Sequence, residues 1–141
     1  MTIYCRMIDL VLEETRLLGI RLRERQGEIA QSSGQSRASW QLLAAASGGG
    51  GTVPQLARGL GQSRQGVQRV ADRLVEGGLA TYESNPHHRR SPRLQLTERG
   101  AATLAALQRE AARRAPDVEQ DMEPEDLETT LYVLRALRDA L

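Results

Sequence analysis

The spacing of apolar residues along the chain predicts a mainly α-helical protein that also contains a small β-hairpin. Residues 3 to about 30 form the longest helical pattern, and apolar side chains cover one broad face of it. A helix of this length carries more apolar surface than one small domain can cover. We therefore expect a second subunit to cover the face formed by Ile3, Met7, Leu10, Leu17 and Leu18.

Residues 52–78 predict two short helices joined by a tight turn. Thr52 and Gln55 form a T-x-x-Q capping box at the start of the first helix. Gly61 ends that helix, because glycine adopts a turn conformation at little cost, and the Ser63 hydroxyl caps the second helix. An arginine- and glutamine-rich face remains opposite the apolar positions of the second helix. This pattern is typical of DNA-binding helix-turn-helix units, and an ordinary helical hairpin is the alternative.

A β-hairpin with a basic tip is predicted directly after this unit. Residues 79–83 form its first strand, and residues 93–97, which alternate polar and apolar side chains, form the returning strand. The loop between them, SNPHHRRSP, is polar and carries two prolines.

Further helices are predicted on both sides of these motifs. Ser36 caps a helix over residues 37–46, and Thr97 caps another that runs from residue 98 to about residue 114. Pro124 opens a final helix that ends at residue 141. Its leucines recur at helical spacing, so we expect this helix to share the subunit interface with the first one.

The charge of the chain is unevenly distributed. The net charge over 141 residues is only +1. Arginines nevertheless outnumber acidic residues between Gln62 and Arg93, whereas residues 116–126 are acidic and contain no basic residue. The acidic segment therefore offsets a local basic patch in the net charge. We expect the acidic segment itself to be a solvated loop followed by the start of a helix.

Several classes of function are excluded by composition. Every basic residue is arginine, which removes P-loop nucleotide chemistry and Schiff-base catalysis, so Gly48–Gly51 is expected to be a flexible turn. The single cysteine excludes an internal disulfide and a thiolate zinc cluster. We find no apolar run long enough for a membrane span and no signal-peptide pattern, so we expect a cytoplasmic protein. We expect no enzyme activity, cofactor or catalytic residue, because no nucleophile and base can be assembled.

The order of these motifs resembles the multiple antibiotic resistance regulator (MarR) family of winged-helix repressors, over essentially the whole chain. The resemblance rests on SWQLL (residues 39–43), TVPQLA (residues 52–57), VADRLVEGGLA (residues 70–80) and LTERG (residues 96–100). Each motif has little specificity by itself, and the resemblance depends on their order and spacing along the chain.

The resemblance implies a homodimer whose first and last helices interlock. Residues 1–35 are then an N-terminal dimerisation helix, residues 36–100 a winged helix-turn-helix lobe, and residues 101–141 the C-terminal dimerisation helices, within a single structural domain. The family reads a palindromic operator in double-stranded DNA with the second helix of the motif and with a wing arginine. Mapped onto this chain, the reading positions are Ser63, Arg64, Gln65, Gln68 and Arg69, and the wing positions are His88, Arg89 and Arg90. Arg73, on the same polar face of the second helix, completes the predicted DNA-binding residues.

One position departs from the family pattern. Family wings often carry Asp-x-Arg, in which the acid orients the arginine, whereas this chain has His88-Arg89-Arg90. The resemblance still favours Arg90 as the minor-groove residue. His88 is expected either to leave that arginine less fixed or to contact phosphate itself when protonated.

Three further side chains allow both a functional and a structural interpretation. Cys5 is either a peroxide-sensing thiol, as in some family members, or a small apolar interface residue, which we favour. His87 and His88 lack further metal ligands nearby, so we expect no metal site there. Trp40 lies where family members line a ligand pocket, and core packing is the preferred interpretation.

The sequence therefore predicts a dimeric, sequence-specific transcriptional regulator, most simply a repressor relieved by a small-molecule ligand. Two alternatives stay open: a winged-helix protein-interaction module that does not bind DNA, and a redox-sensing regulator that uses Cys5.

Overall fold

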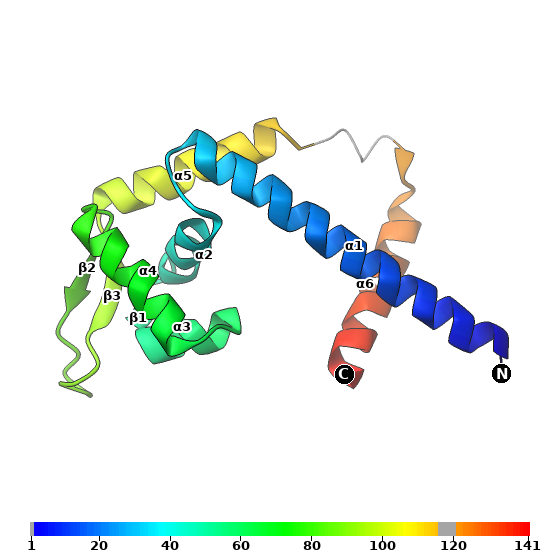
Figure 1. Cartoon of the computed structure of the whole chain (residues 1–141), viewed down its shortest axis with the longest axis horizontal. Helices are drawn as coiled ribbons and strands as arrows, with labels where there is room; N and C mark the ends of the chain where they lie inside the picture. Colours follow the sequence, from blue (N-terminus) through cyan, green and yellow to red (C-terminus); the bar gives the residue numbers. More distant parts are fainter. Residues whose placement is uncertain (1, 116–120) are drawn as a thin grey trace. The chain divides into compact units, whose positions relative to one another are not determined.

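The structure of the protein is a computed structural model that describes residues 2–115 and 121–141, without the side chains of Thr2, Ile3 and Cys5. It is mainly helical with a small antiparallel sheet, as predicted (Figure 1). Its elements are α1 (Thr2–Ser32), α2 (Arg37–Ala46), β1 (Gly51–Thr52), α3 (Val53–Leu60), α4 (Arg64–Glu76), β2 (Ala80–Glu83), β3 (Arg93–Leu96), α5 (Glu98–Arg113) and α6 (Pro124–Ala140). The chain divides into two compact units, Met1–Ala111 and Ala112–Leu141.

The helices of the first unit begin at the capping residues that the sequence predicts. The Ser36 hydroxyl accepts a hydrogen bond from the Ser39 amide at 3.0 Å at the start of α2. The capping box of α3 is complete, because Thr52 Oγ1 accepts from the Gln55 amide and Gln55 Oε1 accepts from the Thr52 amide. Gly61 then adopts a left-handed conformation with a φ of 62°, which turns the chain towards α4.

The sheet has a third strand that the sequence analysis missed. Gly51 and Thr52 pair with Leu94 and Arg93 of β3, so the strand order is β1-β3-β2. The glycine run is therefore not only the flexible turn that we expected, since its last residue is a strand residue. A strand of two residues is too short to show the alternation of apolar and polar side chains that marks a strand in a sequence. Its pairing also depends on residues more than forty positions later in the chain, as Gly51 pairs with Leu94.

Side chains of β3 hold the glycine run in place. Arg93 donates from Nη2 to the Gly49 carbonyl at 2.8 Å, and Gln95 donates from Nε2 to the same oxygen at 2.9 Å. Arg93, which we counted with the basic patch of the sequence, thus also has a structural contact with the turn. These bonds connect the base of the hairpin to the segment between α2 and α3.

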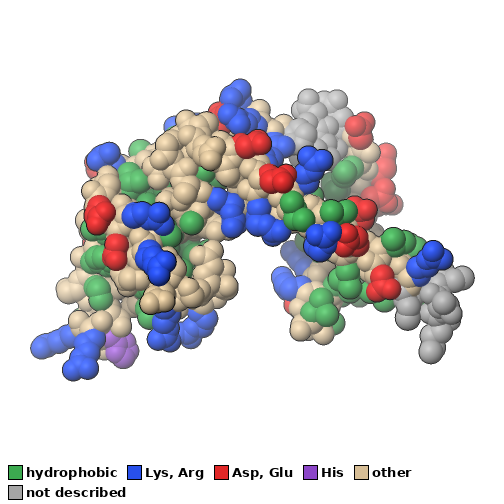
Figure 2. All heavy atoms as spheres, in the orientation of Figure 1, with side chains coloured by type: hydrophobic (Ala, Val, Ile, Leu, Met, Phe, Trp, Pro, Cys, Tyr) green, Lys and Arg blue, Asp and Glu red, His purple; other side chains and the backbone are tan. Residues whose placement is uncertain are grey.

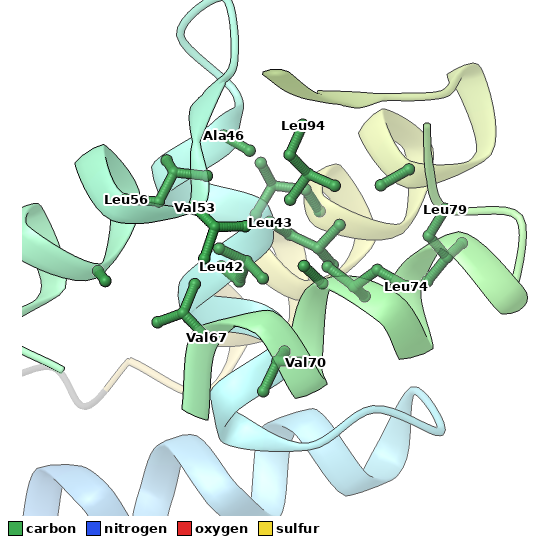
Figure 3. Close-up of a cluster of buried hydrophobic side chains, with 14 of the residues drawn as sticks. Leu42, Leu43, Ala46, Val53, Leu56, Val67, Val70, Leu74, Leu79 and Leu94 are labelled. Carbon is green, nitrogen blue, oxygen red and sulfur yellow. The ribbon is translucent and has the colours of Figure 1, made fainter. Parts of the chain in front are cut away.

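One hydrophobic core supports the helix-turn-helix unit and the sheet (Figure 3). Leu42 and Leu43 of α2 are almost completely buried, and Val67 of α4 and Leu94 of β3 are buried against the same cluster. The predicted inner positions of α4, namely Val67, Val70, Ala71 and Leu74, are all buried. Because α4 is anchored along this stripe, its polar face is held outwards.

Apolar surface remains exposed on the helices at both ends of the chain. On α1 the exposed large apolar residues are Tyr4, Met7, Ile8, Leu10, Leu12, Leu17, Leu18 and Leu22. On α6 no described residue is buried, and Leu127, Leu131, Tyr132 and Val133 are exposed. Among the described residues, no helix combines the length and apolar character needed to cross a bilayer. The Cys5 side chain and residues 116–120 of the acidic segment lie outside the described part of the chain.

Candidate nucleic-acid interface

The polar face of α4 presents the side chains that the sequence singled out. Ser63, the N-cap residue, and Arg64, Gln65, Gln68 and Arg69 are all exposed. The Ser63 hydroxyl accepts from the Gly66 amide at 3.0 Å, which fixes the first turn of the helix. Its own proton remains available to an oxygen outside the protein.

The start of α4 and the wing meet around one hollow. We use the term wing for the hairpin formed by β2, β3 and the loop of residues 84–92. The hollow measures about 440 Å³, and it brings Arg90 of the wing together with Arg64, Gln65 and Gln68 of α4. Val53, Pro54 and Pro92 supply apolar walls. Residues far apart in sequence thus line one concave surface that carries two arginines.

A hydrogen-bonded triangle occupies one side of this hollow. Tyr82 on β2 donates its hydroxyl proton to Asp72 Oδ1 at 2.7 Å. Gln68 Nε2 lies 2.9 Å from the same carboxylate oxygen and 2.7 Å from the Tyr82 hydroxyl oxygen. Gln68 and Asp72 are one helical turn apart on α4, so the triangle connects the helix to the first strand of the wing.

The triangle also sets the protonation states of its members. Burial, and then the neighbouring carboxylate of Asp72, raises the pKa of Tyr82 to about 12 from its ordinary value of 10.0. The hydrogen bonds from Tyr82 and then Gln68 lower the pKa of Asp72 below its ordinary 3.8. At neutral pH the tyrosine is therefore a neutral donor and the aspartate a charged acceptor.

The tip of the wing is basic and exposed, and Figure 2 shows basic and histidine side chains gathered there. Asn85 is buried and organises the loop, because its Oδ1 accepts from the His87 amide and its carbonyl oxygen accepts from the His88 amide. His88, Arg89 and Arg90 are exposed. Within the described residues, the side chains of Arg89 and Arg90 have no hydrogen-bond or ion-pair partner. Over residues 2–115 and 121–141, no acidic side chain therefore orients either arginine.

Arg73 lies on a different flank of α4 from Gln68. The two residues are five positions apart, which corresponds to about 140° around a helix. Arg73 lines a second hollow of about 380 Å³ together with Arg99 of α5 and polar residues such as Ser33 and Thr103. Arg73 therefore lines a different hollow from the one that Arg64, Gln65, Gln68 and Arg90 line.

Trp40 packs half-buried against the hydrophobic core, and it lines neither of the two hollows described above. Among the described residues, no group of three or more histidine, cysteine, aspartate or glutamate side chains is arranged to hold a metal ion.

Sequence reasoning missed the involvement of Asp72 and Tyr82 in the interface. Neither residue stands out in the sequence: Asp72 lies on the polar face of the second motif helix, and Tyr82 lies in the first strand of the hairpin. The spacing of Gln68 and Asp72 on one helix is a usable signal for their contact. By contrast, no local pattern brings Tyr82 to them, because that contact depends on how β2 packs against α4.

The chain is similar to known proteins over most of its length. Residues 33–91 match the sequence profile of the MarR family. The uncharacterized protein Rv2011c of Mycobacterium tuberculosis is 45% identical over 121 residues, which cover 85% of each chain. The crystal structure of a MarR family transcription regulator, SP03579, matches with a TM-score of 0.89 and 25% identity over 99% of this chain and 93% of the other.

A further structural match shares the fold. The transcriptional repressor CouR, solved bound to a 23-mer DNA duplex, has a TM-score of 0.74 and 24% identity over 89% of both chains. The helix-turn-helix followed by a wing, the profile match and the structural likeness agree with one another. The protein belongs to the MarR family of winged-helix transcription regulators.

Proposed function

We propose that the protein is a dimeric, sequence-specific DNA-binding repressor whose affinity for its operator falls when a small molecule binds. The observation that carries the DNA-binding part is the hollow that joins Arg64, Gln65 and Gln68 of α4 to Arg90 of the wing. Basic and amide side chains around one concave surface suit a nucleic-acid duplex, which offers phosphates and base edges together.

The proposed contacts differ between the helix and the wing. Arg64, Gln65, Gln68 and Arg69 lie in the major groove, where arginine and glutamine recognise base edges, and Ser63 and Arg73 contact the backbone. Arg90 enters the minor groove, and His88 and Arg89 contact phosphates beside it. The neutral amides of the helix face add base recognition to the charge attraction of the arginines.

We propose that residues 1–35 and 101–141 form the dimer interface. Support comes from the exposed apolar residues of α1 and of α6, which a monomer would leave in water. Dimerisation sets the distance between the two α4 helices, which must be roughly 34 Å to enter successive major grooves. A small ligand that changes this distance would release the operator. We propose that the half-buried ring of Trp40 borders the site of such a ligand.

DNA binding is tested with fluorescence anisotropy on the DNA upstream of the protein's own coding region. We expect the affinity to fall steeply as salt concentration rises, because several phosphate contacts release counterions. Arg64→Ala should weaken binding by about 1–3 kcal/mol, whereas Arg37→Ala on α2 should have little effect. Arg37→Ala is a matched control, because it removes the same charge from a partly exposed position outside α4, the wing and the proposed dimer interface. Absence of binding, or equal losses in both variants, would favour a protein-interaction module.

A further inference from the structure

The Gln68 carboxamide is held in one orientation by its neighbours. A carboxylate at neutral pH only accepts hydrogen bonds, so the Gln68 atom 2.9 Å from Asp72 Oδ1 must be the amide nitrogen. The Tyr82 hydroxyl gives its proton to the same carboxylate oxygen, so towards Gln68 it can only accept. Both neighbours therefore require the nitrogen, and neither tolerates the amide turned by 180°.

This orientation leaves the two ends of the carboxamide unequal. The nitrogen faces Asp72 and Tyr82, while Gln68 Oε1 has no hydrogen-bond partner among the described residues. A glutamine that is free to turn reads adenine with both ends, accepting from N6 and donating to N7. Both amide protons of Gln68 are already donated, one to Asp72 and one to Tyr82. For Gln68 to donate to N7, one of these bonds would have to break, and the bond to the charged Asp72 carboxylate is the stronger one.

We propose that Asp72 and Tyr82 fix Gln68 as a hydrogen-bond acceptor, so that it selects bases by their amino group alone. The bases that present an amino group in the major groove are adenine, through N6, and cytosine, through N4. Guanine and thymine present acceptors at the corresponding edge and are rejected. The operator position under Gln68 accordingly accepts adenine or cytosine. This inference rests on the proposed DNA binding and concerns one position of the site.

Tyr82 and Asp72 are positioning residues in this scheme. The Tyr82 ring is half-buried on β2, where its backbone is paired with Leu94 of β3. The hydroxyl is thus held by the sheet, while Asp72 is held by α4. Because one partner comes from each element, the orientation of Gln68 is fixed only while the wing is docked against the helix.

The experiment measures base preference in competition binding, with operators that carry each of the four base pairs at every half-site position. The position under Gln68 is the one whose preference disappears in Gln68→Ala. At this position we expect the wild-type protein to bind adenine and cytosine with similar affinity and guanine and thymine about tenfold more weakly, which corresponds to about 1.4 kcal/mol.

Releasing the amide should change that preference in one direction. In the double variant Tyr82→Phe with Asp72→Ala, the amide nitrogen is free to donate to adenine N7, which cytosine lacks. We expect adenine to be favoured over cytosine by about fivefold or more. Tyr82→Phe alone should shift the preference the same way but less, since Asp72 still accepts from the nitrogen. The base preference under Gln65, which has no hydrogen-bond partner among the described residues, is the internal control and should not move.

Three results separate the possible outcomes. The inference is overturned if the wild-type protein already favours adenine over cytosine as strongly as the double variant does. It is also overturned if the double variant has the same base preference as the wild type. A wild-type protein that binds no operator overturns the proposed function as well. Circular dichroism of each variant checks that the fold is intact, since Asp72 is exposed but the Tyr82 ring packs half-buried against the hydrophobic core.

Discussion

Gly100, in the first turn of α5, packs directly against the backbone carbonyl of Leu79, at the end of the turn that follows α4. A Cβ atom at Gly100 would overlap the Leu79 oxygen. The same junction is held by Thr97, whose Oγ1 donates to the Gly78 carbonyl at 2.7 Å and accepts from the Gly100 amide at 3.0 Å. The glycine therefore allows the start of α5 to approach the chain that connects α4 to the wing.

Gly100→Ala should lower the free energy of unfolding by about 1–3 kcal/mol, because the added methyl group must displace backbone atoms. Urea denaturation followed by circular dichroism measures this. Gly59→Ala is the matched control: a Cβ there meets no atom within 4 Å, and the residue lies within α3. Gly59→Ala should raise the free energy of unfolding by about 0.5–1 kcal/mol, since alanine is more favourable than glycine within a helix. Similar losses in both variants would contradict the packing argument.

Thr52→Ala should destabilise the protein by about 1 kcal/mol through loss of the α3 cap. Thr52 Oγ1 accepts from the Gln55 amide in the structure, and alanine leaves that amide without a partner. Thr52→Ser keeps the hydroxyl and should retain most of the stability in thermal denaturation. If Thr52→Ser is as unstable as Thr52→Ala, the buried methyl group, and not the cap, is what matters.

Arg90→Ala should weaken operator binding most when A·T pairs lie under the wing. Minor-groove readout depends on groove width, and A·T-rich segments are narrow and strongly negative. Arg89→Ala, which removes a neighbouring exposed arginine, should instead cost the same on every sequence. Anisotropy titrations of both variants on operators that differ only under the wing make the comparison. Equal, sequence-independent losses would mean that neither arginine is fixed, as expected of a wing with His88 in place of the orienting acid.

The difference in stability between wild type and Tyr82→Phe should be constant from about pH 6 to about pH 9. The pKa of Tyr82 is raised to about 12, so its stabilising contribution is complete below pH 10.0 and is lost as the pH rises through about 12. The pKa of Asp72 is lowered, so its contribution is present above pH 3.8 and is lost as the pH falls through its lower folded value. Urea denaturation across this range checks the result. A change between these limits would place another titrating group next to the triangle.

Removal of Leu127–Leu141 should give insoluble or unfolded protein, because monomers would expose the apolar residues of α1 to water. The readout is sedimentation velocity of the truncated and full-length chains. Replacing Arg138, an exposed residue of the same helix, with alanine is the control and should leave the full-length chain dimeric. A folded, soluble monomer from the truncation would rule out the proposed interface.

Local chemistry in the sequence determined the helices, their caps and the family. The Thr52 capping box, the turn at Gly61 and the buried stripe of α4 all follow from side-chain types at fixed offsets, and the structure confirms each one. Such features depend on neighbours within about one helical turn, so the sequence alone is sufficient to specify them.

Tertiary structure decided the details of the interface. Gly51 becomes a strand residue only because Leu94 pairs with it, and Gln68 acquires its fixed orientation only because β2 brings Tyr82 to α4. Arg73 likewise lines a second hollow together with Arg99 of α5, which no local pattern in the sequence indicates. These relationships join positions that are distant in sequence, and packing of the core, not local periodicity, sets the distance between them.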